Sequence, residues 1–65
     1  MTLEQIAQQT MNYLDSVGVA ADYDLPVDGG IIIITNKCSF HSRHYPNYDS
    51  FIWDIERSNP QKSPA

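Results

Sequence analysis

The sequence predicts an α+β domain in which an N-terminal amphipathic helix packs on a four-stranded antiparallel β-meander. Three observations predict this class: a helical apolar periodicity near the N-terminus, a run of four isoleucines, and turn signals between the later apolar segments. The 65 residues suffice for one small domain of marginal stability. We expect a single domain over residues 1–57 and, because the last segment is polar and proline-containing, a flexible C-terminal tail over residues 58–65.

A helix is expected over residues 3–16. Thr2 is a suitable N-cap, and Gln5 three residues later completes a capping box. Apolar or small side chains then recur at spacings of three and four, at Leu3, Ile6, Ala7, Thr10, Met11, Tyr13, Leu14 and Val17. This is the pattern of one helix face. Gly18 supplies the left-handed residue that commonly ends a helix.

Four strands are expected after the helix. They are Val19–Val27, Ile31–Thr35, Cys38–His44 and Ser50–Arg57. Turns are expected at Asp28-Gly29-Gly30, at Asn36-Lys37 and at Pro46-Asn47-Tyr48-Asp49. The isoleucine run is β-branched and apolar on both faces, which favours a central strand. Pro26 cannot donate a ladder hydrogen bond, so the first strand is expected at an edge.

An apolar patch is expected on the sheet face that a single helix leaves uncovered. Alternation along the fourth strand would place Phe51, Trp53 and Ile55 beneath the helix. The opposite face would then carry Ile32, Ile34 and Ile52, with a rim of His41, Arg43, Tyr45 and Asp54. Exposed apolar patches on small proteins often mark interaction surfaces.

Charge and composition restrict the partners. The net charge is −4, and residues 1–36 contain five carboxylates without any lysine or arginine. Clustered cations for a phosphate backbone are missing, so nucleic acid is not expected as a partner. The longest apolar run, Ile31–Ile34, is too short for a bilayer, and the N-terminus does not resemble a signal peptide. With Cys38 as the lone cysteine, we expect a soluble cytoplasmic protein without membrane contact.

Metal binding remains an alternative. Cys38, His41 and His44 have the spacing of zinc or copper ligands, but strand alternation would point His41 away from the other two, and structural zinc needs a fourth ligand. The acidic strand from Asp24 resembles a calcium loop in part, but Thr35 stands where the loop requires glutamate. No cofactor is therefore expected.

No catalytic function is expected. Cys38 could pair with His41 or His44, and Asp49 could orient the pair, but nothing in the sequence brings them together. Glycine patterns for a phosphate loop are absent from the sequence. A domain of this size also has little room for a walled cleft.

The order of helix, acidic strand, Asp28–Ile33, Pro46-Asn47 and Phe51-Ile52-Trp53 resembles part of a frataxin. In that family, acidic residues on the helix and first strand bind iron. The resemblance covers about the first half of such a fold, and the helix here carries few acids. It therefore implies a shared α-β-β pattern, without transfer of any site residue.

The function expected from these observations is that of a small acidic protein-interaction module, an inhibitor or adaptor that docks on a larger protein. Small acidic domains without catalytic motifs are typical of such proteins, including those of phages and mobile elements. The expected partner-binding residues are His41, Arg43, Tyr45 and Tyr48, with Asp22, Asp24 and Asp28 as an electrostatic rim. Two other outcomes remain open: a homodimer through the open sheet face, and local mimicry of nucleic acid in a basic cleft.

Overall fold

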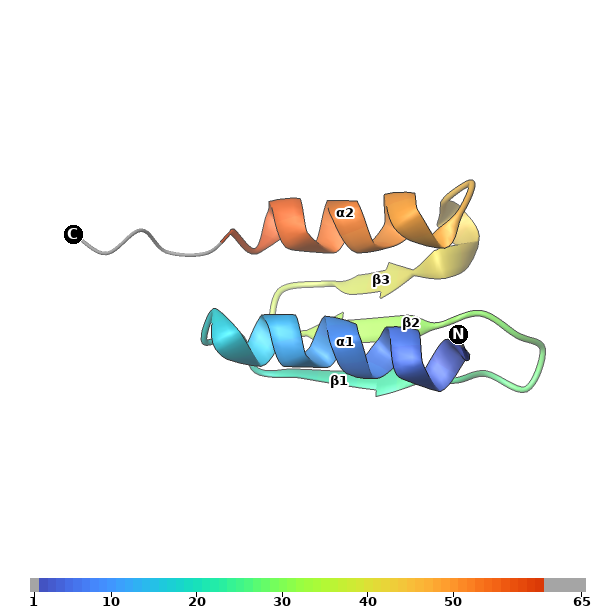
Figure 1. The fold of residues 1–65 in the computed structure, drawn as a ribbon, viewed down its shortest axis with the longest axis horizontal. Coiled ribbons are helices and arrows are strands. Elements are labelled where there is room, and N and C mark those ends of the chain that lie inside the picture. The colour runs from blue at the N-terminus through green and yellow to red at the C-terminus, as the bar shows by residue number, and fades with distance from the viewer. Residues whose placement is uncertain (1, 61–65) are drawn as a thin grey trace.

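A computed structural model describes residues 2–60 as two helices and a three-stranded antiparallel sheet (Figure 1). The elements in chain order are α1 (Leu3–Ser16), β1 (Ala21–Asp24), β2 (Ile32–Thr35), β3 (Ser39–His41), the 3-10 helix η1 (Ser42–His44) and α2 (Tyr48–Ser58). The α+β class is confirmed. The predicted four-stranded meander under one helix is wrong, because the segment expected as the fourth strand is a helix.

The capping box that the sequence predicted begins α1. The Thr2 hydroxyl accepts the N–H of Gln5 at 3.1 Å, and the Gln5 side chain accepts the N–H of Thr2 at 2.9 Å. These two bonds satisfy donors that have no partner within the helix. Ala7, Thr10 and Leu14 are the buried residues of α1, so one face of the helix enters the core. The predicted helix over residues 3–16 is confirmed.

The isoleucine strand β2 lies at the centre of the sheet, between β1 and β3. Ile33 pairs with Tyr23 of β1 and with Phe40 of β3. Ile31, Ile33 and Phe40 are buried, so this face of the sheet forms part of the core. The central position of the isoleucine strand and the edge position of the first strand are confirmed, although Pro26 lies in the loop after β1.

The turn between β2 and β3 is closed by a side chain. The Thr35 hydroxyl accepts the N–H groups of Lys37 and Cys38 at 3.3 and 3.2 Å, and it donates to the carbonyl of Cys38 at 3.0 Å. In addition, the backbone N–H of Thr35 donates to the same carbonyl at 2.9 Å. The turn predicted at Asn36-Lys37 therefore forms, and it does so without a left-handed residue.

The second helix, α2, begins where the sequence predicted a turn before a strand. Asn47 is its N-cap, and the Asn47 side-chain oxygen accepts the N–H of Ser50 at 2.8 Å. Phe51 and Ile55, one helical turn apart, are fully buried, whereas Trp53 is 59% exposed. The alternation of Phe51, Trp53 and Ile55 would suit a strand that buries all three side chains on one face. A helix buries two of them and leaves the large indole outside.

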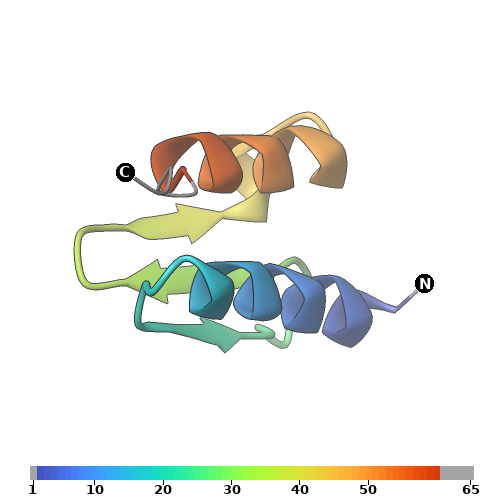
Figure 2. The same ribbon diagram turned by 60° about the vertical axis from the view of Figure 1, so that its left-hand side comes forward.

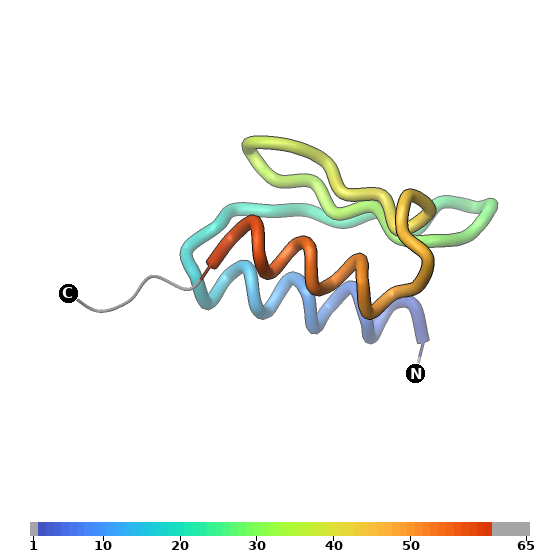
Figure 3. The backbone as a smooth tube through the Cα atoms, turned by 90° about the horizontal axis from the view of Figure 1, so that it is seen from above, coloured from blue at the N-terminus to red at the C-terminus, as the bar shows by residue number. Residues whose placement is uncertain are grey.

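Both helices cover the same face of the sheet. They lie side by side and run in the same direction, with the strands on the other side of them (Figures 2 and 3). α1 contacts β1, and α2 contacts β3. The buried apolar core between the layers consists of Ala7, Leu14, Ile31, Ile33, Phe40, Phe51 and Ile55. Within residues 2–60, no segment covers the opposite face, and neither helix is long and apolar enough to cross a bilayer.

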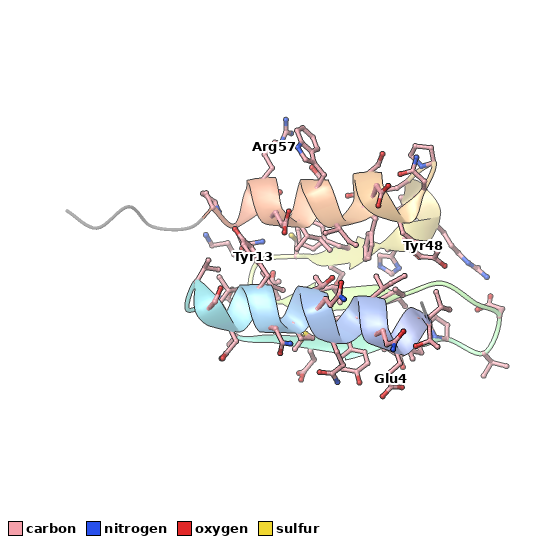
Figure 4. All side chains as sticks on the ribbon, in the orientation of Figure 1. Glu4, Tyr13, Tyr48 and Arg57 are labelled. Carbon is pink, nitrogen blue, oxygen red and sulfur yellow. The ribbon has the colours of Figure 1, made fainter. Side chains whose placement is uncertain are left out.

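The ends of the two helices are tied together. Tyr13 of α1 points towards the end of α2 (Figure 4), where its hydroxyl donates to the carbonyl of Asn59 at 2.9 Å. Asn59 is buried, and its side-chain amide donates to the carbonyl of Ile55 at 3.0 Å. Ser58 and Asn59 thus belong to the end of α2, although we assigned them to the tail. Residues 61–65 of that expected tail lie outside the described residues.

Candidate interaction surfaces

The uncovered side of the sheet, which we call the open face, carries Asp22, Asp24, Ile32, Ile34, Ser39 and His41. The pairing register aligns these side chains in two rows across the strands. One row is Asp22–Ile34–Ser39, and the other is Asp24–Ile32–His41. The open face therefore has an apolar centre on β2, an acidic edge on β1 and an uncharged or basic edge on β3. The prediction that Ile32 and Ile34 lie on an uncovered face is confirmed, but the prediction that Ile52 and Asp54 lie beside them is wrong, because both belong to α2.

The loop between β1 and β2 is fixed to η1 by Ser42. The Ser42 hydroxyl accepts the N–H of Ile31 at 2.8 Å, and the Ser42 N–H donates to the carbonyl of Ile31 at 2.9 Å. Gly30 has a φ of +85°, and a Cβ added there would lie 2.9 Å from the Ser42 hydroxyl. Glycine is thus required at this position by the backbone conformation and by the close approach of Ser42.

Arg43 projects from η1 and holds the tip of the same loop. Its guanidinium donates to the Asp28 carbonyl at 2.8 Å and lies 2.9 Å from the Asp28 carboxylate. The two side chains are 58% and 67% exposed, so their ion pair contributes little to stability by itself. The pair connects the Arg43 side chain to the tip of the loop at the surface.

Two hollows lie on either side of this pair, and both are lined by Asp28 and Arg43. The first, of about 250 Å³, also contacts Pro26, Ile32 and His41. The second, of about 280 Å³, is bounded on its far side by Pro46 and Tyr48. We call Asp28, Gly29, Arg43, Pro46 and Tyr48 the loop end. Tyr48 lies at the start of α2 (Figure 4), close to this loop.

Tyr45 does not share a face with His41 and Arg43, as the sequence predicted, because β3 ends at His41. The Tyr45 ring instead packs on Phe51, with ring centres 5.6 Å apart, and its hydroxyl donates to Asp54 at 2.5 Å. The hydrogen bond to the Asp54 carboxylate, partial burial and the negative charge of Asp54 raise the pKa of Tyr45 to about 12. The hydroxyl of Tyr45 is thus engaged within the chain, while the residue also lines the second hollow beside Arg43, Pro46 and Tyr48.

The expected metal ligands are only partly brought together. The rings of His41 and His44 lie with their centres 5.2 Å apart, but Cys38 lies exposed at the end of the β2–β3 turn, directly before β3. Among residues 2–60, no group of three or more histidine, cysteine or acidic side chains is arranged to hold a metal ion. We base no function on metal binding.

The predicted partner-binding residues divide between the two surfaces. Arg43, Tyr48 and Asp28 meet at the loop end, whereas Asp22 and Asp24 line the acidic edge of the open face. His41 belongs to the open face and also borders the first hollow. Because Asp28 is paired with Arg43, the three aspartates do not form one acidic cluster. Nucleic-acid mimicry stays a prediction, which this arrangement does not favour.

One exposed pair was missed from the sequence. The Arg57 guanidinium lies 4.9 Å from the centre of the Trp53 ring, a cation–π geometry on the outer side of α2 (Figure 4 shows Arg57). The i, i+4 spacing would have indicated this contact on a helix, but we assigned the segment to a strand. The contact covers part of the exposed indole with its own helix.

The chain matches no family model, no curated protein and no solved structure in the comparisons made. These comparisons therefore add no support to the resemblance to frataxins. That resemblance also used Phe51-Ile52-Trp53 as a strand, and these residues belong to α2.

Proposed function

We propose that this chain is a protein-interaction module, of the inhibitor or adaptor kind, that docks on a larger protein through its loop end. The observation that carries the proposal is the Arg43 side chain, which Asp28 holds between two hollows and close to the exposed ring of Tyr48. Arginine and tyrosine are the residues most often found at the energetic centre of protein interfaces, together with tryptophan.

Preorganisation supports this use of the loop end. A free arginine side chain loses conformational entropy when a partner fixes it, about 0.5–1.5 kcal/mol for a long side chain. Arg43 is already restrained by a carbonyl and a carboxylate, and the loop beneath it is fixed by Ser42. Part of this cost is thus met in the free protein.

The two hollows, of about 250 and 280 Å³, lie at the lower end of the volumes of small-molecule sites and are large enough for one side chain of a protein partner. Small-molecule sites usually exceed about 300 Å³ and enclose most of the ligand. The second hollow measures about 280 Å³ and lies between Arg43 and the apolar surfaces of Pro46 and Tyr48. We infer that it receives one apolar or aromatic side chain of the partner, which would stack on Tyr48 and place its polar neighbours near Arg43 and Asp28.

A reducing compartment is the proposed location. Cys38 is free and exposed in the β2–β3 turn. An exposed free thiol is more compatible with the cytoplasm than with an oxidising environment.

Affinity capture with matched variants tests the proposal. Wild type, Tyr48→Ala and Trp53→Ala would each be immobilised and exposed to a lysate of the source cells, after circular dichroism has shown that each variant is folded. We expect one protein to be retained by wild type and by Trp53→Ala, and to be lost or weakened at least about tenfold by Tyr48→Ala. Trp53 is the matched control because it is an exposed aromatic residue outside the loop end.

Two outcomes would contradict the proposal. One is a partner retained equally by all three proteins. The other is a partner lost with Trp53→Ala alone, which would place the docking surface on the outer side of α2.

A further inference from the structure

We infer that a second copy of this chain covers the open face, in a two-fold dimer whose axis runs parallel to β2. Three features of the face lead to this inference: its uncovered isoleucines, its asymmetric charge and the order of its two rows. The inference concerns a different surface from the loop end and does not depend on the proposed docking there.

The apolar centre of the open face needs a cover. Ile34 is 43% exposed, and Ile32 beside it is partly exposed. Sheets usually bury such residues by packing face to face, with mean strand directions aligned within about 30° and a separation of about 10 Å. If a second three-stranded sheet with the same apolar centre packed on this face, the isoleucines of both copies would be buried at once.

Charge decides how the two copies can be oriented. A two-fold axis parallel to β2 exchanges the two sides of the sheet and keeps the rows in place. Each Asp24 then lies opposite His41 of the second copy, and each Asp22 opposite Ser39. Carboxylates on β1 therefore meet hydrogen-bond donors on β3, and this happens twice by symmetry.

The other face-to-face arrangement is unfavourable. A two-fold axis perpendicular to β2 keeps β1 over β1 and exchanges the rows, so that each Asp22 lies opposite Asp24 of the second copy. Two pairs of like charges would then be buried together, and such juxtaposition costs several kcal/mol at an interface. The acidic edge thus selects the axis parallel to β2.

The small area of the face predicts a weak dimer. Three strands about 4.8 Å apart and four residues at about 3.4 Å each give a sheet face of roughly 200 Å². A standard stable interface buries about 800 Å² per partner. We therefore expect weak association, seen as a monomer–dimer equilibrium that shifts with concentration up to about 1 mM.

Analytical ultracentrifugation between about 10 µM and 1 mM tests the dimer with two variants of equal charge change. Ile34→Lys places a charge at the centre of the open face and should weaken association at least about tenfold. Val27→Lys adds the same charge to a fully exposed residue outside this face and should leave association within about twofold of wild type. Circular dichroism of each variant establishes that it is folded.

A charge exchange tests the axis. Asp24→Lys alone should weaken association, because the lysine would face His41 of the second copy. The combination of Asp24→Lys with His41→Asp places a lysine opposite an aspartate at both symmetry-related contacts of this row and should recover association to within a few-fold of wild type. In the arrangement with the perpendicular axis, Asp24→Lys would face Asp22 and would strengthen the dimer.

Several results would overturn the inference. A wild-type chain that remains monomeric at about 1 mM would do so, even if a larger protein were then found to bind the open face. Association lost with Val27→Lys and kept with Ile34→Lys would place the interface elsewhere. Strengthening by Asp24→Lys would refute the axis parallel to β2.

Discussion

Ile33 and Ile34 are neighbours in β2 and identical in chemistry, but they belong to opposite sides of the sheet. Ile33 is fully buried in the core with Phe40, Phe51 and Ile55, whereas Ile34 is 43% exposed in a row with Asp22 and Ser39. The difference arises because both helices cover one face of a three-stranded sheet. One face therefore holds the fold together, and the other lies uncovered within the described residues.

The sharpest test of this comparison replaces each isoleucine by alanine. We expect Ile33→Ala to lower the free energy of unfolding by about 2–5 kcal/mol, since it removes a fully buried side chain and leaves a cavity. Ile34→Ala should lower it by less, about 1 kcal/mol or below, because the side chain is already 43% exposed and mainly loses strand propensity and cross-strand contacts. Urea denaturation followed by circular dichroism measures both.

A loss at the upper end of this range could unfold so small a domain, because its total stability is of the same order. Ile33→Val, with an expected loss of about 0.5–1.5 kcal/mol, then provides the measurable variant, compared with Ile34→Val. Equal losses for the two positions would show that the two faces do not differ as described.

Local sequence signals were enough to predict α1 and the central strand β2, but not the second helix, α2. The capping box at Thr2 and the β-branched run of β2 are local, and both elements were predicted correctly. α2 was missed because Phe51, Trp53 and Ile55 alternate as a strand would. The signal that could have corrected this is Asn47 as an N-cap, followed by apolar residues at Phe51 and Ile55 in helical spacing.

The apolar centre of the open face could be predicted from the sequence, but the loop end could not, because it depends on contacts between segments far apart in the chain. Ile32 and Ile34 were placed on an uncovered face correctly, because alternation within a central strand is local. The meeting of Arg43 with Asp28 could not be read from the sequence, since it depends on how η1 lies against the loop after β1. Tyr45 was misplaced because β3 was expected to continue past His41.

The next test acts on Gly30, in the loop between β1 and β2 next to the loop end, where the backbone has a left-handed conformation. Gly30→Ala should lower the free energy of unfolding by about 1–2 kcal/mol for the left-handed conformation, and by about 1 kcal/mol more for the overlap with Ser42. Gly18→Ala is the matched control, because Gly18 also has a positive φ of +78° but has open space around it. A loss at Gly30 no greater than the loss at Gly18 would show that the approach of Ser42 is not tight.

A smaller effect is expected for Tyr45, which joins the end of η1 to the core face. Tyr45→Phe removes the hydrogen bond to Asp54 and should cost about 1 kcal/mol at neutral pH. The folded-state pKa of Tyr45 is raised from 10.0 to about 12, so its contribution is fully present below pH 10. Above pH 10 the unfolded chain loses this proton first, and the contribution falls as pH rises towards about 12.

Urea titrations of wild type and Tyr45→Phe between pH 8 and pH 12 measure this dependence. The difference in unfolding free energy between the two proteins should shrink across the upper part of this range. A difference that stays constant up to pH 12 would show that the hydrogen bond to Asp54 does not raise the pKa of Tyr45 in the folded protein. The comparison between the two proteins cancels the titration of the other tyrosines.

The smallest effect on stability is expected from the Arg43–Asp28 pair, which restrains a binding surface without supporting the core. Asp28→Asn removes the charge but keeps the backbone carbonyl to which Arg43 donates, and it should cost about 0.5 kcal/mol or less. A double-mutant cycle with Arg43→Ala, measured at low and high salt, isolates the coupling between the two side chains. A coupling well above about 1 kcal/mol that salt does not reduce would mean that the loop end supports the fold, as the core face does. In that case the loop end would lose its distinction from the core face, and a loss of partner binding by Arg43 variants could no longer be separated from a loss of structure.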